Sequence, residues 1–188
     1  MRRWCPLLLL AGCSDPATPP VMMMVGGCDG MVVEVANDSA VHVPVSSPIV
    51  WPSNPPTGGP HYPIWAGWDR QYAQLDRGYY VHNAEHGGIV LLYHCDPECP
   101  DVVAQLVADA QAMRADTSCT APVTKRVVVT SDPLLPVGVQ VAAVAWNFAY
   151  TASCYDPYVQ TFAREHYAHS PENTCADGAN LGGTLLNP

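Results

Sequence analysis

Ile89-Val90-Leu91-Leu92-Tyr93 is an uninterrupted apolar run of strand length. A run of this kind favours a central strand that is buried on both faces of a sheet. Shortly after it, Asp101 stands where a helix N-cap would, and apolar residues then recur at helical spacing through residues 102–114. The sequence therefore predicts a buried strand followed by an amphipathic helix that packs on the sheet.

The segments on either side of this pair supply the other elements. Residues 126–130 read as a second buried strand, 139–150 as a further long apolar element and 158–167 as a second helix. β-branched segments at 31–36 and 41–45 predict a hairpin or two edge strands. Because strands and helices are interleaved, we predict a single α/β or α+β domain with two main helices against one mixed sheet.

The composition excludes several classes of protein. Only 13% of the 188 residues are charged, which argues against a charged disordered tail or a long coiled coil. Seventeen acidic residues oppose eight Lys and Arg, so a surface that neutralises phosphates is not expected and nucleic acid is not predicted as a partner. No apolar run reaches the roughly 20 residues needed to cross a bilayer.

The first residues follow the order of a secretion signal. Residues 1–3 are basic, residues 4–10 are apolar, and Leu10-Ala11-Gly12-Cys13 places two small residues before a cysteine. This box resembles that of bacterial lipoproteins, which implies cleavage before Cys13 and a diacylglycerol on its sulfur.

Three parts of the chain follow from this resemblance. We predict a signal peptide over residues 1–12, a lipidated Cys13 with a flexible tether over 13–27, and one globular domain over 28–188. The protein would then lie on the extracytoplasmic side of a bacterial membrane, held there by lipid alone, with no protein partner identified.

The remaining cysteines suit an oxidising compartment. Of eight cysteines, Cys5 lies in the predicted signal and Cys13 would carry the lipid, which leaves an even set of six: Cys28, Cys95, Cys99, Cys119, Cys154 and Cys175. Short loops cost the least entropy to close, which favours pairing Cys154 with Cys175 and Cys119 with Cys95 or Cys99. Cys28 would pair with the cysteine that remains.

The densest group of metal-ligating side chains is His82-Asn83-Ala84-Glu85-His86-Gly87-Gly88, called here the His82–Gly88 motif. On a strand, His82 and His86 would lie about 13 Å apart. On a helical turn they would be neighbours, with Cβ atoms about 5–6 Å apart and Glu85 beside them. The two glycines are suited to end such a turn just before the central strand. The motif therefore predicts metal ligands on one helical turn.

Other interpretations of the motif remain open. In a purely structural interpretation, His82 and His86 form hydrogen bonds with neighbouring loops, and Glu85 forms a buried ion pair with Arg70 or Arg77. The spacing H-x-x-E-H also matches the inverzincin protease motif, in which Glu85 would act as base and Glu165 could be a third ligand. That motif needs a helix that continues through both histidines, whereas a Gly-Gly pair and a strand follow here.

A second motif, Pro55-Pro56-Thr57-Gly58-Gly59-Pro60-His61-Tyr62-Pro63, lies in a Pro-rich loop over residues 46–63. Together the two motifs resemble the bacterial family catalogued as domain of unknown function 3105, from about Ser53 to about Glu172. The resemblance implies one site built by the loop and the turn, in which His61 joins His82 and His86, but it implies no reaction.

We therefore predict a metal site with the ligands His61, His82, His86 and Glu85, for a copper or zinc ion. His42 and His94 are interpreted as structural. A metal-binding protein is favoured over an enzyme. The alternatives are a metal-dependent hydrolase with Glu85 as base and a non-enzymatic binding module with structural histidines.

The segment around Cys95-Asp96-Pro97-Glu98-Cys99-Pro100 resembles the C-x3-C-P segment of Sco-type copper chaperones. That resemblance implies a thioredoxin-like fold, with copper held by both cysteines and a later histidine such as His166 or His169. The favoured alternative is that Cys95 and Cys99 are disulfide cysteines, bonded to each other or to Cys119, because four other cysteines compete for partners and disulfide sulfur cannot ligate metal.

Overall fold

The structure is a computed structural model that describes residues 20–36 and 39–187. The described residues form one eight-stranded mixed sheet in the order β1-β2-β7-β6-β4-β5-β3-β8. Its strands are Val21–Met24 (β1), Met31–Glu34 (β2), Arg70–Gln74 (β3), Ile89–Tyr93 (β4), Val127–Ser131 (β5), Val141–Ala145 (β6), Phe148–Ala152 (β7) and Thr184–Leu185 (β8). The helices are Arg77–Glu85 (α1), Pro100–Ala112 (α2) and Tyr158–His166 (α3).

The predicted central strand β4 lies inside the sheet. It pairs in parallel with β5 and antiparallel with β6, and its first four residues are buried. Successive side chains of a strand point to opposite faces, so Val90 and Leu92 enter one core while Ile89 and Leu91 enter the other. The prediction of a single domain with a mixed sheet is confirmed.

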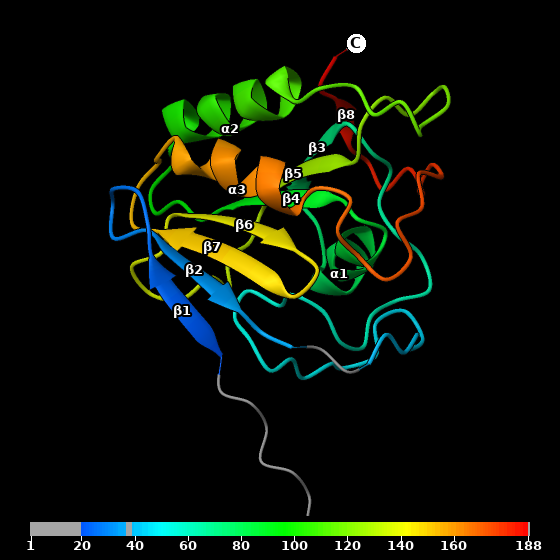
Figure 1. The fold of residues 1–188 in the computed structure, drawn as a ribbon, viewed down its shortest axis with the longest axis horizontal. Coiled ribbons are helices and arrows are strands. Elements are labelled where there is room, and N and C mark those ends of the chain that lie inside the picture. The colour runs from blue at the N-terminus through cyan, green and yellow to red at the C-terminus, as the bar shows by residue number, and fades with distance from the viewer. Residues whose placement is uncertain (1–19, 37–38, 188) are drawn as a thin grey trace, which may run out of the picture.

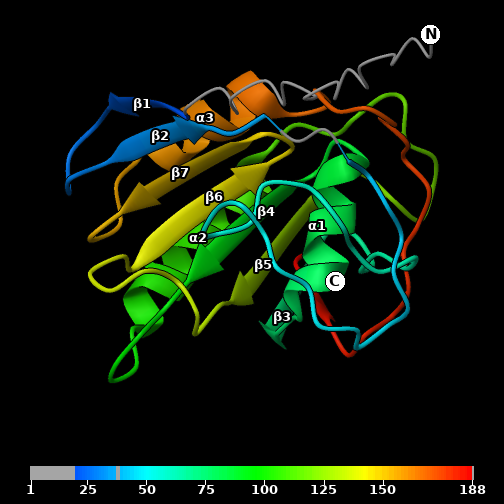
Figure 2. The same ribbon diagram turned by 90° about the horizontal axis from the view of Figure 1, so that it is seen from below.

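The helices cover both faces of the sheet. In Figure 1, α2 and α3 lie on one side of it, where Leu106 and Phe162 pack against Ile89. Helix α1 lies on the other side, where Tyr80 and Val81 join the second core (Figure 2). The sequence predicted α2 and α3 as the main helices, and α1 is the third, shorter one that carries the His82–Gly88 motif.

Several element boundaries differ from the predictions. Val21–Met24 was assigned to the tether, which is wrong, because β1 pairs with β2 along its whole length although its side chains are exposed. Residues 41–45 form no strand and contribute only an isolated bridge between His42 and His61. Residues 139–150 divide into the hairpin β6–β7, with Asn147 at a φ of 68° in the turn. The predicted signal peptide and Cys13 lie outside the described residues.

All six candidate cysteines form disulfides, but the pairings that loop length favoured, Cys154 with Cys175 and Cys119 with Cys95 or Cys99, are wrong, whereas the alternative that Cys95 bonds to Cys99 is confirmed. The pairs are Cys28–Cys154, Cys95–Cys99 and Cys119–Cys175. The sheet, rather than the loop length, determines the pairing of Cys28: β2 lies beside β7, and the Ser153 amide donates to the Cys28 carbonyl at 2.8 Å. Three disulfides are compatible with an extracytoplasmic location. Within residues 20–36 and 39–187, no helix has the length and apolar character needed to cross a membrane.

Candidate metal centre

Helix α1 begins and ends at residues that fix the His82–Gly88 motif in place. The Asp76 carboxylate accepts a hydrogen bond from the Gly78 amide at 2.8 Å and caps the first turn. The helix ends at His86, and Gly87 follows with a φ of 82°, a conformation that favours glycine. At Gly88 a Cβ atom would collide with the Trp68 indole. The predicted helical turn is confirmed.

The Pro-rich loop folds over α1 and is held there by backbone hydrogen bonds. The Tyr62 amide donates to the Gly78 carbonyl at 3.0 Å, which ties the loop to the first turn of the helix. The Val43 amide donates to the His61 carbonyl at 2.8 Å, and the His61 amide donates to the Val41 carbonyl at 3.1 Å. These bonds place His61 over α1 and bring His42 beside it.

Four side chains converge at this point: His42, His61, His82 and Glu85, called here the first ligand group. One ligand atom from each lies within 4.8 Å of all the others. The Nε2 atoms of His42, His61 and His82 lie 3.9, 2.9 and 3.8 Å from Oε2 of Glu85. Ligand atoms around a tetrahedral zinc ion are separated by about 3.3 Å, so small side-chain movements would complete the site.

Main-chain carbonyls orient two of these imidazoles. Nδ1 of His61 lies 2.8 Å from the Gly59 carbonyl, and Nδ1 of His82 lies 2.7 Å from the Tyr62 carbonyl. Because a carbonyl can only accept, each Nδ1 carries the proton and each Nε2 presents a lone pair. Metal-ligating histidines are oriented by hydrogen bonds of this kind.

The centre of the group contains polar atoms without hydrogen bonds. Nε2 of His61 and Oε2 of Glu85 are both buried and lie 2.9 Å apart, and with the proton of His61 on Nδ1 both atoms are acceptors. Neither atom has another hydrogen-bond partner in the part of the chain that the structure describes. A buried polar atom without a partner costs about 1–3 kcal/mol, which a bound cation would offset.

The ionisation states also suit metal binding. Burial lowers the pKa of His82 from 6.5 to about 4, and the neighbouring His61 and His86 act in the same direction. Burial opposes ionisation of Glu85, but the pKa of this carboxyl still lies below its ordinary value, because protonation of the neighbouring His61, His82 or His42 imidazole favours the carboxylate. At neutral pH the site therefore offers a neutral imidazole and an ionised carboxylate, which are the forms that bind cations.

The low pKa of His82 predicts a loss of stability in acid. The ordinary imidazole pKa returns on unfolding, so the unfolded chain binds more protons than the folded chain between pH 6.5 and about 4. The free energy of unfolding of the metal-free protein should therefore fall as the pH falls through this window. Urea titrations at about pH 7 and about pH 4.5 should show a larger loss for the wild type than for His82→Gln. Equal losses would contradict the assignment to His82.

His86 lies beside the first ligand group but belongs to another one. Its ring stacks on that of His82 with centroids 4.7 Å apart, and Trp65 covers it at 4.3 Å. Ligand atoms of Glu85, His86 and Glu172, called here the second ligand group, also lie within 4.8 Å of one another. Of the four predicted ligands, His61, His82 and Glu85 therefore lie in one group, and His86 lies next to it. The fourth member of that group is His42, which was interpreted from the sequence as structural.

The alternative ion pair for Glu85 is wrong. Arg77 pairs with Asp132 at 2.9 Å, and Arg70 donates to the Gly183 carbonyl at 3.1 Å. The basic side chains within 4 Å of the Glu85 carboxylate among the described residues are instead imidazoles. Asn83 of the same motif has a structural role, because its side chain exchanges two hydrogen bonds with the backbone of Ala66.

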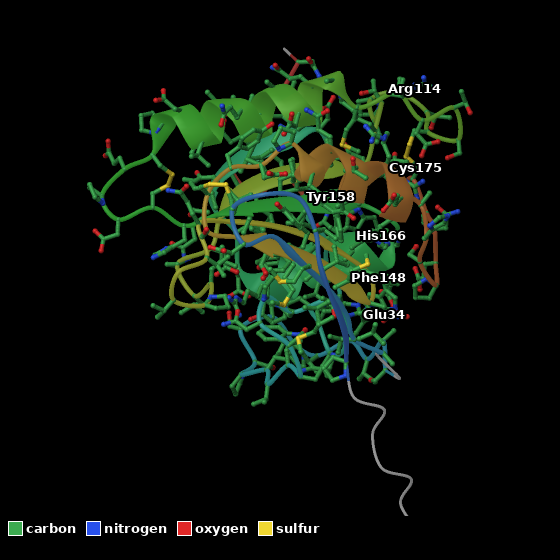
Figure 3. All side chains as sticks on the ribbon, turned by 60° about the vertical axis from the view of Figure 1, so that its left-hand side comes forward. Glu34, Arg114, Phe148, Tyr158, His166 and Cys175 are labelled. Atoms are coloured by element: carbon green, nitrogen blue, oxygen red, sulfur yellow. A yellow bond between two sulfur atoms is a disulfide. The ribbon has the colours of Figure 1, made fainter. Side chains whose placement is uncertain are left out.

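The proposed chaperone-like site does not assemble. Cys95 and Cys99 are bonded to each other, so neither sulfur is a thiolate. His166 stacks on Phe148, where Figure 3 shows both side chains. The sheet register puts these rings at the opposite end of β6 and β7 from Cys95. His169 and the inverzincin candidate Glu165 are exposed and lie in neither ligand group.

A third group of candidate ligands fails on chemical grounds. Asp116 lies near Cys119 and Cys175, but these two sulfurs form a disulfide. Disulfide sulfur is a poor ligand because metals bind the thiolate. The first and second ligand groups therefore remain as the metal-binding candidates among the described residues.

The comparisons with known proteins agree with the two sequence motifs. No curated protein and no solved structure matches the chain, so the likeness to Sco-type chaperones and the thioredoxin-like fold gain no support. A family model described as "Protein of unknown function (DUF3105)" matches residues 42–178, a range that contains both ligand groups. Because this match covers well over half of the chain, the protein belongs to the DUF3105 family.

Proposed function

We propose that this protein binds a divalent transition-metal ion through Nε2 of His42, His61 and His82 and the carboxylate of Glu85. The observation that carries the proposal is the orientation of the two buried imidazoles. Each donates Nδ1–H to a main-chain carbonyl and turns Nε2 toward one ionised carboxylate that lacks a hydrogen bond on its inner oxygen. The two nitrogen lone pairs and the carboxylate oxygen are all acceptors, so a cation is the group that would bind to all of them.

The donor set limits the choice of ion. Three imidazole nitrogens and one carboxylate oxygen suit zinc and copper(II), both of which bind imidazole well. All six cysteines outside the first 20 residues are oxidised, so soft thiolate ligands for copper(I) are not offered by the described residues. Copper(II) should bind more tightly than zinc, following the usual order of divalent ions.

The lipid anchor remains part of the proposal. The Leu10-Ala11-Gly12-Cys13 box and the three disulfides together support a protein that matures outside the cytoplasm and is tethered through Cys13. The metal site would then lie close to the outer side of a membrane, where it could capture metal ions or deliver them.

Calorimetric titration of the metal-free, disulfide-bonded protein with zinc and with copper(II) tests the proposal. Wild type should bind both ions tightly, and Glu85→Gln should weaken binding by at least about 100-fold, because it removes the only carboxylate of the first ligand group. Glu98→Gln is the matched control, since Glu98 is exposed. Absence of binding by the wild type, or equal affinity of Glu85→Gln, would contradict the proposal.

The same variant separates a ligand from a catalytic base. A general base acts on a metal-bound water without holding the ion, so Glu85→Gln would keep the metal and lose only hydrolysis. Oε2 of Glu85 lies 2.9 to 3.9 Å from the three Nε2 atoms, close to the separation of ligands that share one ion, which favours the role of ligand.

A further inference from the structure

His86 is a buried histidine whose two ring nitrogens form no hydrogen bond with any residue of 20–36 or 39–187. The residue is only 4% exposed, and both Nδ1 and Nε2 lack a partner in the part of the chain that the structure describes. A neutral imidazole has one donor and one acceptor, and leaving both unmade in the interior is costly. In this respect His86 differs from His61 and His82, whose Nδ1 atoms are satisfied.

The ring of His86 is not placed to share an ion with His82. The two imidazoles stack 4.7 Å apart with an angle of only 15° between their planes. Lone pairs lie in the plane of the ring, so those of two nearly parallel rings run side by side and do not meet at a point about 2.0–2.1 Å from each. His86 therefore faces a position next to the one served by His82.

Carboxylates flank this second position. Nε2 of His86 lies 3.7 Å from Oε2 of Glu172, and Glu85 completes the second ligand group within 4.8 Å.

The segment that carries Glu172 is fixed beside the end of α1. Its amide donates to the Glu85 carbonyl at 3.4 Å, and the neighbouring Asn173 accepts from the Arg126 guanidinium at 2.6 Å. The same guanidinium donates to the His86 carbonyl at 2.7 Å. The disulfide between Cys175 and Cys119 adds a covalent link. The half-exposed Glu172 carboxylate is thus held over His86 by its backbone.

We propose that His86, Glu172 and Glu85 bind a second divalent cation, so that Glu85 bridges a two-metal centre. This inference rests on the proposed function, because the first ion shares Glu85. A carboxylate has two oxygens and can bind one ion with each, and paired ions in such centres lie about 3.5–4 Å apart. That separation is similar to the 4.7 Å between the stacked rings that serve the two positions.

The two positions differ in how completely the protein surrounds them. Each includes one half-exposed side chain, His42 or Glu172, but the first offers four protein ligands whereas the second offers three. The second ion should therefore bind more weakly and retain a site for water or an anionic ligand. Two divalent ions against two carboxylates also leave excess positive charge, which favours an oxyanion such as phosphate at that open site.

Native mass spectrometry of the full disulfide-bonded chain with zinc alone tests this inference. Wild type should bind two zinc ions, while Glu172→Gln and His86→Gln should each bind one. Glu165→Gln, which alters an exposed carboxylate outside both groups, should still bind two. Glu172→Gln keeps the test valid if His86→Gln fails to fold, because Glu172 is half exposed.

The possible counts separate the two proposals. One ion on the wild type overturns the second site and leaves the first in place. Absence of zinc overturns both. Two ions on the wild type and on both variants would place the second ion elsewhere and would also overturn the inference.

Paramagnetic resonance with copper(II) supplies an independent readout. Two copper ions about 4 Å apart broaden each other's signals strongly. Wild type loaded with two equivalents should give a magnetically coupled spectrum, and Glu172→Gln should give the spectrum of an isolated ion. An isolated-ion spectrum from doubly loaded wild type would contradict a bridging Glu85.

Discussion

Replacing His61 with alanine is expected to lower the affinity for zinc by about 1,000-fold or more, because the change removes one of four ligands from a buried centre. The ring is fully buried, Nδ1 is held by the Gly59 carbonyl, and Nε2 lies 2.9 Å from Oε2 of Glu85. A water molecule can take the ligand position of the lost nitrogen, but it is not held in a fixed orientation as the imidazole is. Competition with a chelating dye of known affinity would measure the change.

Two further variants keep this result interpretable. His42→Ala removes a ligand that is 48% exposed, so it should weaken zinc binding with little effect on folding. His94→Ala is the matched control, because His94 follows β4, at the opposite end of that strand from the His82–Gly88 motif, and lies in neither ligand group. If all three variants bound zinc as the wild type does, the first ligand group would not be a metal site.

Removing the Cys28–Cys154 disulfide is expected to lower the free energy of unfolding by about 5 kcal/mol in the chain-entropy model. The bond links residues 126 positions apart and joins the segment after β1 to the segment after β7. The Cys95–Cys99 bond spans only 4 positions, so its removal should cost about 2 kcal/mol.

Urea denaturation of the two double serine variants would measure this difference. Cys28→Ser with Cys154→Ser tests the long loop, and Cys95→Ser with Cys99→Ser is the short-loop control. Equal losses for the two would show that loop length does not determine their contributions.

The sequence predicted the parts of the centre that depend on local structure. His82 and Glu85 occupy one helical turn because the motif ends in Gly87-Gly88 and runs directly into the buried strand β4. A helix end and an apolar strand are determined by neighbouring residues, so both can be read from spacing. The role of His61 came from the resemblance of its loop to a family motif.

The remaining parts depend on contacts between distant segments. His42 joins the centre through a backbone bridge to His61, and nothing in its own neighbourhood predicts that bridge. Cys28 meets Cys154 because β2 pairs with β7, a strand order that the lengths of the loops do not determine. The i, i+4 spacing of His82 and His86 predicted neighbours correctly, but it could not distinguish converging rings from the stacked rings that the structure contains.

The exposure of His42 has a consequence for kinetics. The other three members of the first ligand group are buried, so an ion that enters the proposed site would meet the His42 ring first and would leave it last. The affinity of the proposed site would then depend on all four ligands, whereas the rate of exchange would depend on one ring at the surface. A partner with its own imidazole would be able to take the ion from this ring by stepwise ligand substitution, without opening of the fold.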